Sequence, residues 1–234
     1  MPSSTTEKHL LLFGASRGLG LAIAEEYLKL GWSVVATARQ AAGTALHKLA
    51  EQSEGRLEVE TVDIAEPAQV AALHRRLQTR RFDFLLVNAG VTNDPKQTIA
   101  EVATEEFVRV LVTNALSPLR VIETFQDLVT PTGSIGVMSS GLGSVANNES
   151  GGFEVYRSSK AALNTLMRSF AARHRGDKRT LLLLAPGWVR TDMGGPDARL
   201  SIEESIPNLV RTIQAHEGRG GLHYFDYLGR TVPW

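Results

Sequence analysis

Short apolar segments with the length of a β-strand alternate with longer amphipathic segments along the chain, and this alternation limits the possible folds more than any other feature. Strands that alternate with helices of about ten to twenty residues are typical of βαβ units, which build a parallel sheet with right-handed crossovers. Residues 82–87 are almost wholly apolar, as expected for a strand that helices cover on both faces. The predicted strands are residues 10–13, 33–38, 57–62, 82–87, 134–138, 180–185 and 222–225.

Segments with helical spacing lie between these strands, and residues 156–174 carry the strongest pattern. No repeat, linker or low-complexity segment interrupts the 234 residues, so we expect one α/β domain over residues 1–234. The predicted helices are residues 19–30, 41–52, a segment that begins at Pro67, 104–115 with a continuation past Pro118 to about 128, 156–174 and 201–215.

The composition excludes several classes of function. The 25 basic and 25 acidic residues balance without a run of lysine or arginine, which argues against a nucleic-acid or membrane-surface partner. The absence of cysteine excludes thiol chemistry, and six scattered histidines predict no metal site. No apolar stretch approaches a membrane span, and the apolar run after the polar residues 1–8 is broken at Gly14, too early for a secretion signal. We therefore expect a cytoplasmic protein.

The candidate reactive group is Tyr156, four residues before Lys160 in a predicted helix. This spacing places both side chains on one helix face. A nearby ammonium favours the phenolate, so it can lower the pKa of a tyrosine from about 10 and make it a general acid/base. Ser139 and Ser140, at the end of the preceding strand, could bond the same reacting oxygen. An ordinary exposed tyrosine–lysine pair would give the same spacing.

A glycine-rich turn, G-A-S-R-G-L-G at residues 14–20, joins the first predicted strand to the first predicted helix. Glycines at this place permit a tight turn and a close approach of the backbone to a pyrophosphate, which then faces the helix N-terminus. The alternative is an ordinary βα turn. The context of the turn favours a dinucleotide site.

Arg39 follows the second predicted strand, where an acidic residue would bond the 2′-hydroxyl of NAD. A cation at this position suits the 2′-phosphate of NADP instead, and Arg17 could join it. The alternative for Arg39 is a surface arginine at a strand end. Asp63, after the third strand, is expected either to accept from an adenine amine or to serve as an acid ahead of the helix at Pro67.

Three further motifs follow predicted strands or interrupt a helix. N-A-G at residues 88–90 offers small residues at the carboxyl edge of the sheet, although a simple turn would look alike. Asn114 lies in an apolar helical stretch, which favours a buried polar role. P-G-W-V-R-T at residues 186–191 is either a capping turn or a segment whose Thr191 bonds a carboxamide. Residues 141–146 fit G-x-G-x-x-A, but the turn-like residues after them predict a mobile loop and not a phosphate site.

Taken together and in order, these motifs resemble the short-chain dehydrogenase/reductase family over residues 10 to about 191. Within that family, V-M-S-S-G-L-G-S and Y-R-S-S-K-A-A-L-N are similar to the small carbonyl-reductase branch, which includes sniffer-type reductases and C-factor-like proteins. The resemblance implies a doubly wound Rossmann-type sheet of about seven strands, in the order 3-2-1-4-5-6-7, with helices on both faces. One dinucleotide-binding domain would also carry the catalytic site, with substrate loops near residues 141–153 and 188–200.

The resemblance also implies roles for matching residues. Tyr156 would be the acid/base, and Lys160 would lower its pKa and hold the nicotinamide ribose. Ser140, rather than Ser139, would orient the substrate oxygen, and Asn114 would support a water in a proton relay. The residues expected to line the cofactor are Gly14, Ser16, Arg17, Gly18, Leu19, Gly20, Arg39, Asp63, Ile64, Asn88, Ala89, Gly90, Tyr156, Lys160, Pro186, Gly187, Val189 and Thr191.

The chain departs from the family pattern at Phe13, where a threonine is usual, and at Val87, where an asparagine is usual. Phe13 removes a side-chain bond expected to tie the glycine turn to Asn88. The expected activity is NADP(H)-dependent reduction of a small aldehyde or ketone. The alternatives are an NADP-binding signalling protein of C-factor type and an NAD-dependent alcohol dehydrogenase. The family further implies a homodimer or homotetramer that forms through the helices beginning near Thr104 and Tyr156.

Overall fold

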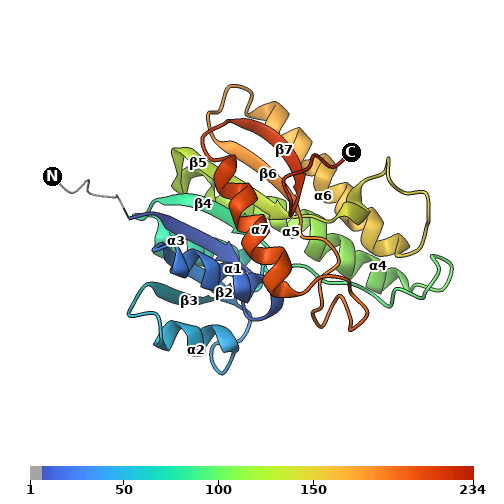
Figure 1. The fold of residues 1–234 in the computed structure, drawn as a ribbon, viewed down its shortest axis with the longest axis horizontal. Coiled ribbons are helices and arrows are strands. Elements are labelled where there is room, and N and C mark those ends of the chain that lie inside the picture. Colours follow the sequence, from blue (N-terminus) through green and yellow to red (C-terminus); the bar gives the residue numbers. More distant parts are fainter. Residues whose placement is uncertain (1–6) are drawn as a thin grey trace.

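The computed structural model describes residues 7–234, so the expectation about the polar N-terminus falls largely outside the described residues. All strands belong to one parallel sheet in the order β3-β2-β1-β4-β5-β6-β7, which confirms the predicted order (Figure 1). The strands are β1 His9–Phe13, β2 Ser33–Ala38, β3 Leu57–Thr61, β4 Phe82–Val87, β5 Val129–Met138, β6 Thr180–Ala185 and β7 Gly221–Asp226.

Helices cover both faces of the sheet, as predicted for a doubly wound fold (Figure 1). Residues of α3, α5 and α6 pack in one core, and residues of α1, α2 and α7 pack in the other. The helices are α1 Gly18–Lys29, α2 Ala45–Glu51, α3 Pro67–Leu77, α4 Thr104–Leu111, α5 Ser117–Phe125, α6 Glu154–Arg173 and α7 Ile202–Ala215. Three short helical turns complete the described elements: η1 Val112–Leu116, η2 Gln126–Leu128 and η3 Gly141–Gly143.

The central strands supply both cores because neighbouring side chains point to opposite faces of the sheet. In β1, Leu11 and Phe13 face the core under α3, α5 and α6, whereas Leu10 and Leu12 face the other. Every residue of β6 is buried. Burial of each Leu or Phe side chain contributes about 1.5–3 kcal/mol to the free energy of folding. The sheet is therefore a rigid platform. Because all strands are parallel, the loops after β1, β4, β5 and β6 emerge at the same edge of the sheet.

The predicted helix over 104–128 is divided into α4, a π-helical turn, α5 and a 3₁₀ turn. Pro118 has no N–H to donate to the carbonyl of Asn114 four residues earlier, so the regular ladder is interrupted. The backbone N–H of Ser117 instead reaches Val112, five residues back, which defines the π turn. The π turn places Asn114 at the centre of this irregular segment.

Two other boundaries differ from the predictions by more than two residues. β5 begins at Val129 and not at 134, because Phe82 pairs with Val129 and Phe84 with Ser134, a register shift that accommodates the polar residues between them. α2 begins at Ala45 and not at 41, after Gly43 adopts a φ of +78°. In contrast, β2, β4 and β6 begin and end at the predicted residues.

Candidate active site

The glycine turn between β1 and α1 is held by two side chains from neighbouring strands. Asn88 Nδ2 donates to the Gly14 carbonyl at 2.7 Å, and Gly14 N–H donates to Thr37 Oγ1 at 3.0 Å. Phe13 is fully buried and packs edge-on against Phe125, with ring centroids 5.2 Å apart. The side-chain bond that Phe13 cannot make is therefore not needed to tie the turn to Asn88, because Asn88 bonds the Gly14 backbone directly.

The geometry of this turn requires glycine. Gly14 has a φ of +85°, and a Cβ there would lie 2.6 Å from Ala89 Cα. A Cβ on Gly20 would lie 2.1 Å from the Gly14 carbonyl oxygen. The turn therefore packs directly against the N-A-G segment that ends β4, at the carboxyl edge of the sheet.

The N-terminus of α1 fits an anionic ligand. The helix begins at Gly18, its N-cap residue Arg17 makes no side-chain cap bond, and its first turn holds no acidic residue. The first N–H groups of a helix have no intrahelical partner and carry a partial positive charge. Such an end is a ready site for a phosphate group. These residues fit the pyrophosphate of a dinucleotide.

The loop after β6 meets this helix end, so two predicted cofactor segments come together. A Cβ on Gly18 would lie 3.7 Å from Thr191 Cγ2, and Arg17 forms an exposed ion pair with Asp192 at 2.9 Å. Thr191 Oγ1 accepts from Gly194 N–H at 3.0 Å within its own turn. Arg17 is thus directed at Asp192. That Arg17 and Arg39 bind the same phosphate stays a prediction, and it requires this ion pair to open.

Of the other residues in these two segments, Pro186 and Val189 are buried, Gly187 is exposed, and Ser16 and Leu19 are half-buried. The Pro186 carbonyl accepts from the Ser205 hydroxyl of α7 at 2.7 Å, which fixes the start of the loop. The loop after β6 is therefore anchored at its base and contacts α1 at its tip.

The predicted adenosine contacts differ in how available they are. Arg39 is exposed at the end of β2 and forms no salt bridge within residues 7–234. Asp63 is half-buried, and its Oδ1 accepts from Ala65 N–H at 2.9 Å ahead of α3. Ile64 is buried in the core under α3 and α5, so its side chain packs inside the protein. Arg39 is free to bind an anion, whereas Asp63 also shapes the start of α3.

Asn114 is fully buried, which confirms the polar burial predicted from its apolar surroundings. Its amide donates to the Val91 carbonyl at 2.8 Å and to Ser159 Oγ at 2.9 Å, and its Oδ1 accepts from Val91 N–H at 2.8 Å. These bonds connect the loop after β4 to α6. A role for Asn114 in holding a water stays a prediction.

The two adjacent serines have different surroundings. Ser139 is buried, and its hydroxyl donates to Asn164 Oδ1 at 2.6 Å. Ser140 is half-buried, its Oγ accepts from Leu142 N–H at 3.2 Å, and its hydroxyl lies close enough to Tyr156 to oppose the rise in the pKa of that phenol. Only Ser140 of the two thus presents a hydroxyl beside the tyrosine.

Lys160 lies one helical turn after Tyr156 on α6, with its Nζ 5.6 Å from the centroid of the Tyr156 ring. It is buried, and its ammonium donates to the Met138 carbonyl at 2.8 Å. An ammonium has three donors, and this is its one hydrogen bond within the part of the chain that the structure describes. A Cβ on Gly90 would lie 3.5 Å from Nζ, so Lys160 faces the N-A-G segment. The remaining donors suit the hydroxyl groups of a ribose.

The pKa of Tyr156 is displaced in the direction opposite to the one expected from its neighbour Lys160. Burial raises the pKa of Tyr156 to about 12, and the neighbouring Ser140 hydroxyl opposes this rise only in part. Burial also lowers the pKa of Lys160 to about 8. Desolvation disfavours the charged form of both groups, and here it outweighs the attraction between ammonium and phenolate because Nζ is directed at Met138.

Four residues that support this site were not predicted from the sequence. Thr37 holds the glycine turn, Ser159 holds Asn114, and Asn164 and Tyr224 bond the Ser139–Ser140 segment. Asn164 stands one helical turn after Lys160, so its spacing on α6 could have indicated a shared face. Tyr224 lies on β7, and no local pattern connects it to Ser140.

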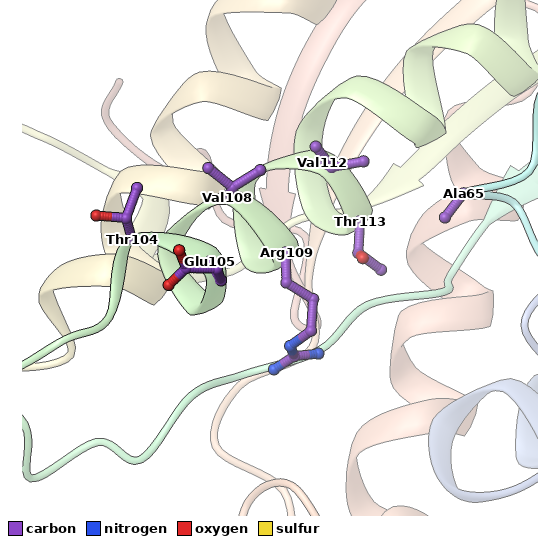
Figure 2. Close-up of a pocket in the computed structure, with 7 residues that line it drawn as sticks. All are labelled: Ala65, Thr104, Glu105, Val108, Arg109, Val112 and Thr113. Atoms are coloured by element: carbon purple, nitrogen blue, oxygen red, sulfur yellow. The ribbon is translucent and has the colours of Figure 1, made fainter.

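A separate surface groove follows the outer face of α4 and the π turn (Figure 2). Arg109 crosses this region, pairs with Glu106 and donates to the Thr92 carbonyl at 3.0 Å. None of the groove residues was predicted as a site residue. They are Ala65, Thr104, Glu105, Val108, Arg109, Val112 and Thr113.

Over residues 7–234, the structure contains no cluster of three or more histidine or carboxylate side chains placed to hold a metal ion. Nor does this range contain a helix with the length and apolar character that crossing a membrane requires.

A parallel sheet with a glycine turn before its first helix and a serine, tyrosine and lysine at its carboxyl edge is the arrangement expected of a dinucleotide-dependent oxidoreductase. The family model for the short chain dehydrogenases matches residues 8–199, and the chain belongs to this family.

Three similar proteins extend this result. The chain is 59% identical to a short-chain dehydrogenase/reductase from Burkholderia multivorans solved with bound NADP, with a TM-score of 0.96 over 97% of this chain and 100% of that one. It is 38% identical to a carbonyl reductase from Pseudomonas aeruginosa PAO1 in complex with NADP, with a TM-score of 0.91 over 98% of this chain and 100% of that one. C-signal of Myxococcus xanthus is 39% identical over 158 residues, which are 65% of this chain and 92% of that protein.

The predicted resemblance to the small carbonyl-reductase branch is confirmed by these proteins, together with the carbonyl reductase Sniffer of D. melanogaster at 27% identity.

Proposed function

We propose that this protein is an NADP(H)-dependent reductase that converts the carbonyl group of an aldehyde or ketone to an alcohol, and that one domain over residues 1–234 carries both cofactor and catalytic sites. The observation that carries the proposal is the Ser140 hydroxyl beside Tyr156, together with the Nζ of the buried Lys160 5.6 Å from the centroid of the tyrosine ring. These three residues lie at the same sheet edge as the glycine turn, which leads into a helix without a side-chain N-cap bond. These two features support a proton donor that acts beside a bound dinucleotide.

The reduction needs one hydride at the carbonyl carbon and one proton at the carbonyl oxygen. When bound, the reduced dinucleotide supplies the hydride. Tyr156 donates its phenolic proton to the oxygen, and the Ser140 hydroxyl holds that oxygen in place. A tyrosine whose pKa is about 12 stays protonated at neutral pH, as a proton donor must. The Lys160 ammonium, 5.6 Å from the ring centroid, then stabilises the phenolate that remains.

The same pKa favours reduction over oxidation at neutral pH. Alcohol oxidation requires Tyr156 to accept a proton as a phenolate, and burial makes the phenolate rare at neutral pH. The reverse reaction as an alcohol dehydrogenase should therefore become faster at alkaline pH.

The choice of NADP over NAD rests on Arg39, which is exposed and unpaired within the described residues. Two similar proteins were solved with bound NADP, which supports the same cofactor here. Loss of a charge-assisted bond to a phosphate costs about 1.5–3 kcal/mol, or roughly 10- to 100-fold in affinity. We expect Arg39→Asp to weaken NADPH binding by that factor while NADH binding is little changed. Equal affinity of the wild type for both cofactors would refute this part of the proposal.

NADPH oxidation with a panel of aldehydes and ketones tests the reductase function. We expect Tyr156→Phe to abolish turnover of any substrate found and to leave NADPH binding intact. Tyr27→Phe is a matched control, because it also removes one phenol hydroxyl, and this hydroxyl lies in the separate core that α1, α2 and α7 cover. Normal turnover by Tyr156→Phe would show that this tyrosine is not the proton donor.

The similarity to C-signal favours a second candidate, an NADP-binding protein that signals through partners. The two candidates differ in their need for a proton donor. A cellular phenotype that survives Tyr156→Phe would support signalling, whereas one lost together with turnover would support the enzyme.

We further propose assembly into a homodimer or homotetramer through α4 and α6. Val108, on α4, and Leu166, on α6, are 49% and 37% exposed, and Leu116 in the π turn between α4 and α5 is 39% exposed. A mass measurement by light scattering tests this proposal. A monomer at micromolar concentration would contradict it.

A further inference from the structure

A buried polar network lies directly beneath Ser140 and involves no residue to which the proposed reaction assigns a role. Its members are Ser139 on β5, Asn164 on α6 and Tyr224 on β7, all less than 5% exposed. Ser139 Oγ donates to Asn164 Oδ1 at 2.6 Å. The network therefore connects three separate elements under the residue proposed to hold the substrate oxygen.

Tyr224 fixes the backbone of Ser140. Its hydroxyl donates a hydrogen bond to the Ser140 carbonyl, which also accepts from Gly143 N–H at 2.8 Å. Tyr224 is itself held firmly, because it lies in register with Leu183 of β6 and its carbonyl accepts from Val232 N–H at 2.9 Å. The position of Ser140 thus depends on a phenol from the opposite side of β6.

Asn164 fixes the turn that follows Ser140 onto the helix of Tyr156 and Lys160. Its amide donates to the Gly143 carbonyl at 3.1 Å. A Cβ on Gly143 would lie 2.9 Å from Lys160 Cβ, so the η3 turn packs against α6 without a gap. Asn164 and Tyr224 therefore tie the Ser140 backbone and the turn that follows it to α6 and β7.

We propose that Tyr224 and Asn164 are positioning residues that hold Ser140 at the distance from Tyr156 that the reaction requires. The inference rests on the reductase function proposed above. Both side chains are buried and bond the backbone or side chains of the 139–143 segment, so they act through Ser140 and not on the substrate. Tyr224→Phe removes the bond to Ser140 and keeps the ring that packs against Trp234.

A double-mutant cycle between Tyr224→Phe and Ser140→Ala tests the proposal. Misplacing a catalytic group by about 1 Å can cost up to about 10²-fold in rate, so we expect Tyr224→Phe to lower kcat roughly tenfold with an unchanged KM for NADPH. Residues that act through one another are not additive. In the Ser140→Ala background, Tyr224→Phe should therefore lower kcat by less than about twofold.

The outcomes separate the two proposals. If Ser140→Ala impairs turnover and Tyr224→Phe lowers kcat by the same factor in both backgrounds, Tyr224 does not act through Ser140 and the inference is wrong. A fully active Ser140→Ala would overturn the reductase mechanism as well. Asn164→Ala provides a second variant from another element with the same expected pattern. Tyr27→Phe controls for the loss of a buried phenol hydroxyl, and thermal unfolding confirms that each variant is folded.

Discussion

Lys160 should make the protein less stable than it would be with an apolar residue in its place. The side chain is 3% exposed, and burial lowers its pKa from the ordinary value of 10.5 to about 8. At about 1.4 kcal/mol per pH unit, this difference corresponds to roughly 3 kcal/mol spent on keeping the ammonium charged at pH 7. Lys160→Met keeps most of the volume and removes the charge.

The substitution also removes the hydrogen bond to the Met138 carbonyl. Leaving that carbonyl unpaired costs about 1–3 kcal/mol, so the net gain of Lys160→Met at pH 7 is about 0–2 kcal/mol. For a chain of this size, such a gain raises Tm by up to about 6 °C. Turnover should be lost, because the same ammonium supports Tyr156 and faces the N-A-G segment.

The stability difference between Lys160→Met and the wild type should depend on pH. Between pH 8 and 10.5 the unfolded chain still holds a proton on Lys160 that the folded protein has released, so wild-type stability from this group rises with pH. The advantage of Lys160→Met is therefore complete below pH 8 and becomes a small disadvantage as the pH approaches 10.5, because only the loss of the bond to the Met138 carbonyl then remains. Urea unfolding of both proteins at pH 7 and pH 10 measures it. Lys48→Met, on an exposed lysine of α2, is the matched control and should change stability by less than about 0.5 kcal/mol. A destabilised Lys160→Met at pH 7, or an advantage independent of pH, would refute the reasoning.

Three further predictions concern the glycine turn, an unpartnered hydroxyl and the pH dependence of turnover. Gly14→Ala should destabilise by more than about 2 kcal/mol and abolish NADPH binding, because its Cβ would meet Ala89 and its φ is +85°; thermal unfolding that matches the wild type would contradict this. Tyr27→Phe should stabilise by up to about 1 kcal/mol, since the buried Tyr27 hydroxyl has no partner among residues 7–234, and a clear loss in urea unfolding would be inconsistent with it. The kcat/KM for NADPH should fall above pH 8 as the Lys160 ammonium loses its proton; a profile flat to pH 10 would show that the charge is not required.

The sequence predicts those parts of the protein that local patterns determine. The apolar runs of β4 and β6 fix their own bounds, and the spacing of Tyr156 and Lys160 fixes a shared face of α6. The buried state of Asn114 follows from its apolar neighbours, although the π turn around it depends on Pro118 four residues later.

Features that join distant segments could not be predicted in the same way. Tyr224 reaches Ser140 from 84 residues away, and Arg17 pairs with Asp192 only because the loop after β6 folds over the start of α1. The direction in which the pKa of Tyr156 shifts also depends on the burial of the whole site. The four-residue spacing to Lys160 does not describe that burial.

A crystal structure with a bound nicotinamide dinucleotide would test the central claim most directly. We expect the Lys160 ammonium within hydrogen-bond distance of the nicotinamide ribose, and the Tyr156 and Ser140 hydroxyls converging on the space beside the reactive carbon of the ring. Hydroxyl groups of Tyr156 and Ser140 directed away from that carbon, with the dinucleotide seated on the glycine turn, would contradict the proposed reaction.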